Sequence, residues 1–196
     1  MTAYQHTNRR GDVYYLQSGK TKTGKPRYYL GRKLTGAPVE RVPDGYEIWE
    51  NPANAQVYVR KFRPSPIIEA EREFLEEAIR TQAGLAHFVV DIEGPHLVVY
   101  LIDQDPDDVA GLIGGMFGAP DGLFGASRDW AVRNAEYSKM MRFTLVDEDE
   151  RIFAVERWCF RGSIDDWSPL FGRGPLPDVV DRYVEHLGQE SFYELI

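Results

Sequence analysis

Runs of β-forming residues occur in neighbouring pairs along this chain, and each pair is separated by residues that favour turns. Such pairs predict antiparallel hairpins, because parallel strands need regular crossovers through helices. Helical segments stand between the pairs, so the sequence predicts an α+β fold with antiparallel sheets and packed helices. The four predicted hairpins pair 13–17 with 27–30, 46–50 with 56–60, 87–92 with 96–102, and 140–146 with 151–160.

The first two predicted hairpins belong to a small N-terminal module. Their strands show partial alternation of apolar and polar residues, which indicates a sheet with one apolar face and one charged face. We expect about four antiparallel strands in this sheet. The connection inside the first hairpin is long in the sequence and contains Gly19, Gly24 and Pro26.

The third and fourth hairpins are expected to share one sheet in the C-terminal region. The runs 87–92 and 96–102 are almost continuously apolar, which is typical of strands covered on both faces. This hairpin is therefore expected at the centre of the C-terminal core. The segment 162–177 is expected to be a loop, and the tail 191–196 is expected to pack on the core.

Capping residues and helical periodicity predict the helices. The strongest helix begins with Ser65 as N-cap and Pro66 in the first turn, and it extends to Gln82. A short helix is expected after Asp105, which would cap it. Further helices are expected within 127–138 and over 178–187, and the glycine-rich segment 111–125 is expected to end a helix and continue as a hydrophobic loop.

Charge is distributed unevenly along the 196 residues, whose net charge is −8. Residues 1–64 hold 12 Lys and Arg against 5 Asp and Glu, a balance of +7, whereas residues 65–196 hold 11 against 26, a balance of −15. The change coincides with Pro64-Ser65-Pro66 and marks a candidate domain boundary. We therefore expect a basic β-rich module over 1–64, a connecting helix over 65–84 and an acidic α+β domain over 85–196.

Composition predicts a soluble, cytoplasmic protein without a membrane partner. Hydrophobic residues are 43% and charged residues 28% of the chain, and the longest apolar runs are strand-sized. The N-terminus shows no apolar segment of the signal-peptide type. The single cysteine, Cys159, lies between Trp158 and Phe160 in a predicted strand, where a buried and unreactive thiol is expected.

The basic N-terminal hairpin is the candidate binding site. Its charge opposes the net charge of the chain, and tyrosines are interleaved with its cations. Sheet-based proteins that bind single strands use cations for the phosphates and aromatic rings for the bases. The pattern therefore predicts contact with nucleic acid or another polyanion. The expected site residues are Lys20, Lys22, Lys25, Arg27, Arg32, Lys33, Tyr15 and Tyr29.

The sequence carries no catalytic or metal-binding signature. Gly19-Lys20-Thr21 lacks the upstream glycine and the following helix of a phosphate-binding P-loop. The four histidines lack ligand spacing, so neither a metal nor a cofactor is expected. Asp165 and Asp166 in an expected loop, together with His186, are the residues that an enzyme of unknown type would use.

The leading hypothesis is a non-enzymatic binding protein whose basic module contacts nucleic acid or another polyanion. The alternative is a protein-interaction or scaffold protein with no nucleic-acid role, in which the basic face meets an acidic protein surface. A third interpretation needs no ligand, because lysines in a turn keep a sheet edge soluble and a basic module can dock on the acidic remainder of its own chain. The arrangement of the cations on the surface distinguishes these alternatives.

Overall fold

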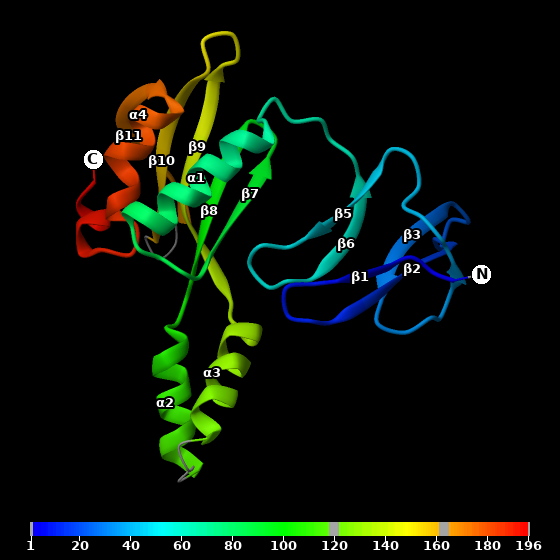
Figure 1. Ribbon diagram of the computed structural model, residues 1–196. Helices are drawn as coiled ribbons and strands as arrows, with labels where there is room; N and C mark the ends of the chain where they lie inside the picture. The colour runs from blue at the N-terminus through cyan, green and yellow to red at the C-terminus, as the bar shows by residue number, and fades with distance from the viewer. Residues whose placement is uncertain (1, 118–121, 161–164, 196) are drawn as a thin grey trace. The chain divides into compact units, whose positions relative to one another are not determined.

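A computed structural model describes residues 2–117, 122–160 and 165–195 and confirms the α+β class (Figure 1). The described strands pair in antiparallel fashion and form sheets of four, two and five strands. The chain divides into two compact units, Met1–Arg63 with Gln104–Glu136 (unit 1) and Pro64–Asp103 with Tyr137–Ile196 (unit 2). The limits of the expected basic module, connecting helix and acidic domain remain predictions.

Unit 1 contains two antiparallel sheets. The first is built around β2, which pairs with β3 along one edge and with β1 and β4 along the other. The second consists of β5 and β6. The strands are β1 Gln5–Thr7, β2 Val13–Lys20, β3 Pro26–Gly31, β4 Ala37–Pro38, β5 Tyr46–Glu50 and β6 Val57–Lys61.

The two N-terminal hairpins form separate sheets rather than the single sheet that the sequence suggests. Both edges of β2 are occupied, since the short strands β1 and β4 pair on the side that β3 leaves free. Strands of two or three residues are too short to show a period of two, so their pairing cannot be recognised in the sequence. Among the described strands, β5 and β6 pair only with each other.

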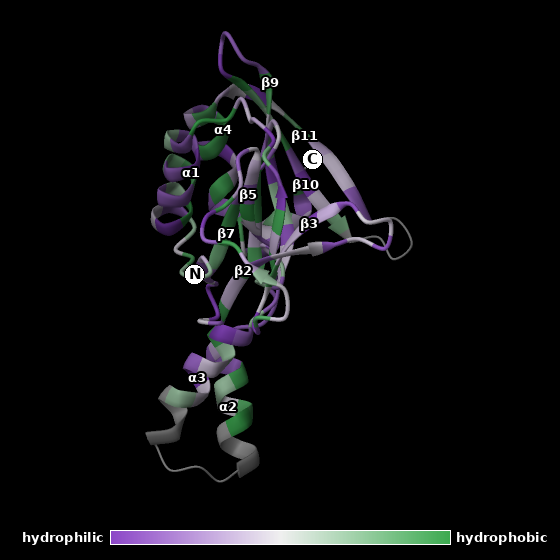
Figure 2. Cartoon of the chain, turned by 90° about the vertical axis from the view of Figure 1, so that its right-hand side faces the viewer, coloured by the Kyte–Doolittle hydropathy of each residue, from purple (hydrophilic) through white to green (hydrophobic). Residues whose placement is uncertain are grey.

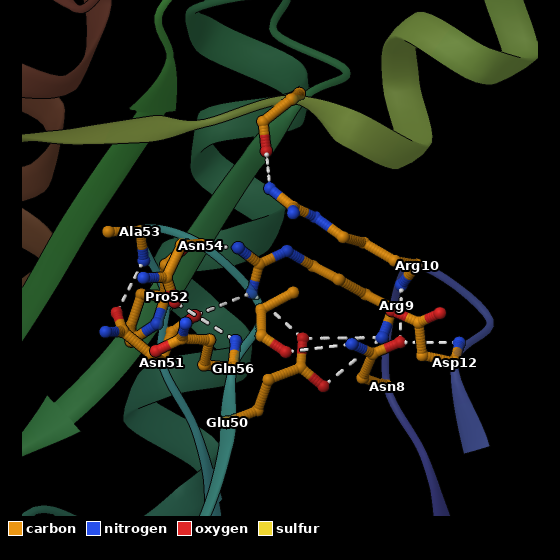
Figure 3. A network of polar contacts seen from close by, with 12 residues as sticks. Asn8, Arg9, Arg10, Asp12, Glu50, Asn51, Pro52, Ala53, Asn54 and Gln56 are labelled. Atoms are coloured by element: carbon orange, nitrogen blue, oxygen red, sulfur yellow. Dashed lines mark hydrogen bonds and ion pairs between the residues drawn. The ribbon is translucent and has the colours of Figure 1, made fainter. Parts of the chain in front are cut away.

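A network of polar contacts joins the β1–β2 turn of unit 1 to its β5–β6 turn (Figure 3). Asn8 is 5% exposed; its Oδ1 accepts hydrogen bonds from two backbone N–H groups of its own turn, and its Nδ2 donates to the carbonyl of Ala55 at 2.8 Å. The guanidinium of Arg9 donates to Glu50 at 2.9 Å. These bonds hold two turns together that lie more than 40 residues apart in the sequence.

The remainder of unit 1 consists of two helices, α2 Pro106–Phe117 and α3 Gly122–Asn134, which pack on each other. Oδ1 of Asp105 accepts a hydrogen bond from the N–H of Asp107 at 2.8 Å, which confirms the predicted cap. The segment 111–125, expected to end a helix and continue as a loop, is instead helical at 111–117 and 122–125, and residues 118–121 lie outside the described residues. Among the described helices, none is long and apolar enough to span a membrane.

Unit 2 is built on a five-stranded antiparallel sheet in the order β11-β10-β9-β8-β7. The third and fourth predicted hairpins share this sheet, as expected. Its fifth strand, β11, occupies the segment that was predicted as a loop. The prediction was wrong because prolines and glycines interrupt the strand pattern in this segment. Such residues are tolerated in an edge strand, and β11 bulges opposite Val155. The strands are β7 Phe88–Glu93, β8 His96–Ile102, β9 Tyr137–Asp147, β10 Ile152–Phe160 and β11 Asp165–Pro175.

Two helices, α1 Glu69–Gln82 and α4 Leu176–Tyr183, cover one face of this sheet (Figure 1). Their apolar sides pack with alternate strand residues such as Leu97 and Phe143, both fully buried. Figure 2 shows α1 coloured mainly as hydrophilic, because most of its residues are polar; its buried residues are Leu75, Ala78 and Ile79. Short 3-10 turns follow at Val184–His186 and Glu190–Glu194, and buried Phe192 packs the tail on the core as expected.

The first helix begins three residues later than predicted, with Ile68 rather than Ser65 as its N-cap. The hydroxyl of Ser65 accepts the N–H of Ile67 at 3.0 Å and donates to the carbonyl of Gly94, so it closes a local turn before the helix. The carboxylate of Glu71 instead accepts the N–H of Ile68 at 3.0 Å and caps the helix start. Arg151 also donates to Glu71, which ties this helix to the β9–β10 turn.

Candidate nucleic-acid interface

The candidate site lies on the hairpin formed by β2 and β3 in unit 1. The register pairs Lys20 with Pro26, so both strands extend further than predicted and the connection shortens to five residues, 21–25. A turn closes this connection through a hydrogen bond from the N–H of Gly24 to the carbonyl of Thr21 at 2.9 Å. Gly24 has a φ of 80°, which a residue with a side chain rarely adopts.

The threonines of the connection stabilise the turn. Oγ1 of Thr21 accepts the N–H of Lys25 at 3.1 Å and also contacts Oγ1 of Thr23 at 3.0 Å. Both hydroxyls are thus engaged within the turn. The turn is therefore held by its own polar groups, and its lysine side chains are left outside this network.

We define the hairpin tip as Lys20, Lys22, Lys25 and Arg27. All four side chains are exposed, and no ion pair links any of them to a described residue. Exposed and unpaired ammonium groups lose little hydration on meeting a phosphate and need not break an internal bond first. The tip is therefore available to an anionic partner.

The predicted cations do not converge on one face. Lys20 and Arg27 lie on opposite faces of the hairpin, because Arg27 pairs with Gly19 and side chains alternate along each strand. Arg32 and Lys33 follow β3 at the other end of the hairpin, roughly 20 Å from the tip at about 3.3 Å per residue. The structure thus brings four of the six cations together around the tip.

The two predicted stacking tyrosines are both half-buried. Tyr29 pairs with Gln17 across the hairpin, and a Cβ atom at Gly36 would overlap its hydroxyl, so the chain after β3 passes directly over this ring. The guanidinium of Arg27 lies 5.6 Å from the centre of the same ring. Tyr15 lies farther along the same face, opposite Gly31. These rings offer only a limited surface to a base.

Gln17 holds the covering segment in place. It is fully buried, and its Oε1 accepts the N–H groups of Thr35 at 2.6 Å and Gly36 at 2.7 Å. Its Nε2 donates to the carbonyl of Lys33 at 2.8 Å. A single buried amide therefore satisfies three backbone groups of the segment that lies over the tyrosine face.

A second group of cations and aromatic rings lies on the unit 2 sheet, on the face opposite α1 and α4. The guanidinium of Arg142 lies 4.5 Å from the ring centre of Trp167, which contacts Trp158 edge to face at 5.0 Å. The ammonium of Lys139 lies 5.8 Å from Trp158 and 5.9 Å from Tyr100. We call these five residues the sheet-face cluster; sequence analysis missed them.

The charges of the sheet-face cluster are internally satisfied. Arg142 makes a bidentate pair with Glu156, which lowers the pKa of that carboxyl. Glu93 accepts the hydroxyl of Tyr100 at 2.6 Å and lies 4.0 Å from Lys139. Burial, followed by this hydrogen bond, raises the pKa of Tyr100. The register of four strands, with a bulge in β9 between Lys139 and Arg142, brings these residues together, so no local pattern in the sequence indicated the cluster.

His96 lies beside this cluster. Its Nδ1 contacts the hydroxyl of Thr144 at 2.9 Å, and that hydroxyl donates to Glu156. Burial lowers the pKa of His96, and the charge of Arg142 acts in the same direction. A neutral imidazole within a closed hydrogen-bond chain is typical of a structural residue.

The three residues proposed for an enzyme do not show a catalytic arrangement with each other. Asp166 accepts the N–H of Trp167 at 2.7 Å, and Asp165 is exposed. His186 contacts the hydroxyl of Ser191 at 2.9 Å. Cys159 is buried, as expected. Within residues 2–117, 122–160 and 165–195 no group of three His, Cys, Asp or Glu is placed to hold a metal ion.

No protein-family model, no curated protein and no solved structure matches this chain. Its function is therefore argued from its own residues.

Proposed function

We propose that the hairpin tip binds the phosphate backbone of nucleic acid and that the protein is a binding protein. The observation that carries this proposal is the set of exposed, unpaired cations at 20, 22, 25 and 27. Within unit 1, Arg9, Arg32 and Arg60 are each engaged with a carboxylate, whereas the four tip cations are exposed without an ion-pair partner among the described residues and lie close together on one hairpin end. Charge left unpaired at one protruding turn favours contact with an external polyanion.

Contact with phosphates agrees better with the geometry than contact with bases. The rings of Tyr15 and Tyr29 are half-buried, and Arg27 is already placed against Tyr29. The tip cations lie on both faces of the hairpin. This arrangement favours contact with an extended phosphate backbone over stacking on a flat base. Binding of this kind recognises charge and does not depend strongly on sequence.

The net charge of −8 sets the conditions for binding. The acidic part of the protein repels a phosphate backbone at long range, and salt screens this repulsion over a Debye length of about 10 Å at 0.1 M. The attraction at the tip acts over a few ångströms and involves few phosphates. We therefore expect a short binding footprint and a modest affinity that falls as salt is added.

The test is a charge reversal with a matched control. The tip variant carries Lys20→Glu, Lys22→Glu and Lys25→Glu, and the control carries Arg41→Glu, Lys61→Glu and Arg63→Glu, which are exposed cations of unit 1 outside the tip. Both variants change the net charge equally. Affinity for a labelled single strand and for a duplex is measured by fluorescence anisotropy over a range of salt concentrations.

We expect the wild-type protein to show a slope of log affinity against log salt of about −2 to −3 from the three lysines. The tip variant should lose binding, and the control should retain most of it. Equal losses in both variants would show that only the overall charge matters. Absence of wild-type binding to DNA and RNA at low salt would remove the proposal and favour an acidic protein surface as the partner of the tip.

A further inference from the structure

Unit 1 contains a polar hollow of about 560 Å³ beside the base of the β2–β3 hairpin. Four segments line it: the β1–β2 turn, the β5–β6 turn with the start of β6, the residues where β2 begins and β3 ends, and Glu136 after α3. Its volume lies in the range of small-molecule sites, roughly 300–1,000 Å³. The polar network in Figure 3 joins the β1–β2 turn to the β5–β6 turn. Hydrogen bonds therefore hold these two walls of the hollow together.

The charges that line the hollow cancel. Arg32 is paired with Asp12 at 2.5 Å, and Arg10 donates through Nη2 to the carbonyl of Ala135 at 2.8 Å. Glu136 supplies a second carboxylate to the lining. Two arginines and two carboxylates give no net charge, so the hollow does not select a free anion. Its chemistry instead suits a neutral ligand with both donors and acceptors.

Several polar groups of the hollow lack a partner among the described residues. Nε of Arg10 is buried without an acceptor among the described residues, and because it is buried it is not itself presented to a ligand in the open hollow. The amide of Gln56 uses its oxygen to accept the hydroxyl of Tyr58 and leaves its NH₂ group unused by the described chain. Asn54 likewise accepts the N–H of Gln56 at 3.0 Å through its oxygen only. The hollow therefore presents both unused donors and carboxylate acceptors.

Two aromatic rings complete the lining. Tyr58 is 44% exposed, and the ring of Trp49, its partner across the β5–β6 hairpin, lies beside it with the ring centres 5.9 Å apart. Tyr14 lines the hollow from β2, with the guanidinium of Arg32 5.7 Å from its ring centre. Of the two rings only Tyr58 is exposed, and an exposed ring beside mixed donors and acceptors matches a nucleobase, whose edge carries both kinds of group and whose faces stack on aromatic rings.

We propose that this hollow holds one base of a single-stranded nucleic acid. The inference rests on the proposed function, since the strand that supplies the base is the one that the hairpin tip holds by its phosphates. The hollow and the tip lie at opposite ends of β3, roughly 20 Å apart along the strand. One strand that follows this hairpin therefore reaches both, with phosphates at the tip and a base in the hollow.

The experiment titrates ¹⁵N-labelled full-length protein with adenosine, guanosine, cytidine or uridine and follows the side-chain amide signals of Asn54 and Gln56. Uncharged nucleosides do not need the tip, so the hollow is tested on its own. Ribose serves as the ligand control and the side-chain amide of Gln82 in α1 as the internal control. We expect saturable shifts of Asn54 and Gln56 with at least one nucleoside and none with ribose.

Two variants, Tyr58→Leu and Gln56→Leu, test whether the residues of the hollow bind the nucleoside. Tyr58→Leu should weaken nucleoside binding about five-fold or more, since one stacked ring is lost. The matched variant Tyr193→Leu, an exposed tyrosine of unit 2, should leave it unchanged. Gln56→Leu should also weaken binding, because it removes an unused donor with little risk to the fold at an exposed position.

The outcomes separate the two proposals. Absence of nucleoside-dependent shifts, or equal shifts with ribose, overturns the inference about the hollow and leaves oligonucleotide binding at the tip to be judged by its own variants. Nucleoside shifts that Tyr58→Leu and Gln56→Leu both leave intact also overturn it. Nucleoside binding in a protein that binds no oligonucleotide would show that the hollow takes a free nucleoside, which overturns both the proposed strand in the hollow and the proposed role of the tip.

Discussion

The hairpin tip and the sheet-face cluster contain the same kinds of residue in opposite states. The lysines at the tip are exposed and have no ion-pair partner among the described residues. In the sheet-face cluster, Arg142 is paired with Glu156 and stacked on Trp167, and Lys139 lies near Glu93 and two rings. Cations and aromatic rings together therefore do not define a binding surface; their internal partners decide whether they are available.

The tip cations lack ion-pair partners and the cluster cations have them because the two groups occupy different positions in their sheets. The tip is a turn at the end of a two-strand projection, where no neighbouring strand can supply a carboxylate. The cluster lies across the central strands of a five-stranded sheet, where cross-strand neighbours are about 5 Å apart and opposite charges pair readily. The cations of the hairpin tip are therefore available to an external partner, whereas those of the sheet-face cluster stabilise the fold.

The largest expected effect concerns the cluster. Arg142→Ala should lower the free energy of unfolding by about 2–3 kcal/mol, because it leaves the half-buried Glu156 without its partner and removes the stacking on Trp167. Arg27→Ala, which removes a guanidinium stacked on Tyr29 at the tip, is the matched control and should cost less than about 0.5 kcal/mol. Urea unfolding measures both. Equal losses of unfolding free energy in the two variants would show that the sheet-face cluster and the hairpin tip do not differ in their contribution to stability.

The next effect concerns the segment that covers the tyrosine face of the hairpin. Gln17→Leu should lower the free energy of unfolding by about 1–2 kcal/mol, because the N–H groups of Thr35 and Gly36 lose their buried acceptor. The same change at Gln5, an exposed residue of β1, is the control. A second readout is quenching of tyrosine fluorescence by acrylamide, which should increase if Tyr29 becomes exposed. A stable variant with unchanged quenching would show that Gln17 does not hold the segment.

Acid should weaken unit 2 through the cluster. The pKa of His96 is lowered below 6.5 by burial, so the unfolded chain binds the proton first and stability falls as the pH drops below about 6.5. The pKa of Glu156 is lowered below 4.5 by Arg142, so its contribution is present above pH 4.5 and is lost as the pH falls through the lower folded value.

Thermal unfolding of the wild-type protein and of His96→Gln across pH 4 to 8 measures this effect. Glutamine keeps a hydrogen-bonding group near Thr144 but does not titrate, so the variant should lose the pH dependence between 6.5 and the folded pKa of His96. An unchanged profile in the variant would assign the dependence to other groups.

The smallest expected effect on stability is at the tip. The triple variant Lys20→Glu, Lys22→Glu and Lys25→Glu should change the free energy of unfolding by less than about 0.5 kcal/mol, because exposed charges contribute little. The same variant should lose nucleic-acid binding. A large loss of stability in urea would instead show that these lysines support the hairpin itself.

Much of the fold was predictable from local pattern. The hairpins β2–β3, β5–β6, β7–β8 and β9–β10 follow from paired β-forming runs with turn residues between them. The cap at Asp105 was also predictable, since a single side chain and the following backbone make the bond. The strand β11 was not, because Pro169 and Gly172 remove its periodicity and only the neighbouring β10 supplies its hydrogen bonds.

The residue types of the candidate site were predictable from the sequence, but the positions of these residues relative to one another were not. The sequence placed six cations and two tyrosines in one segment, and the structure separates Arg32 and Lys33 from the tip and covers Tyr29 with the segment held by Gln17. The hollow could not be predicted, because Arg10, Gln56 and Tyr58 meet only through the contacts between two turns.

By itself the sequence determined the α+β class, the hairpins and the sign of the charge in each half, because these depend on residues close together in the chain. The tertiary structure alone decided which charges remain free, since a lysine or arginine is neutralised by whatever carboxylate the fold brings beside it. Arg142 meets Glu156 because two strands pair in one register, and Lys22 meets none because its turn projects beyond the last pair, Lys20 and Pro26. Pairing across strands is a long-range property, and a local pattern does not contain it.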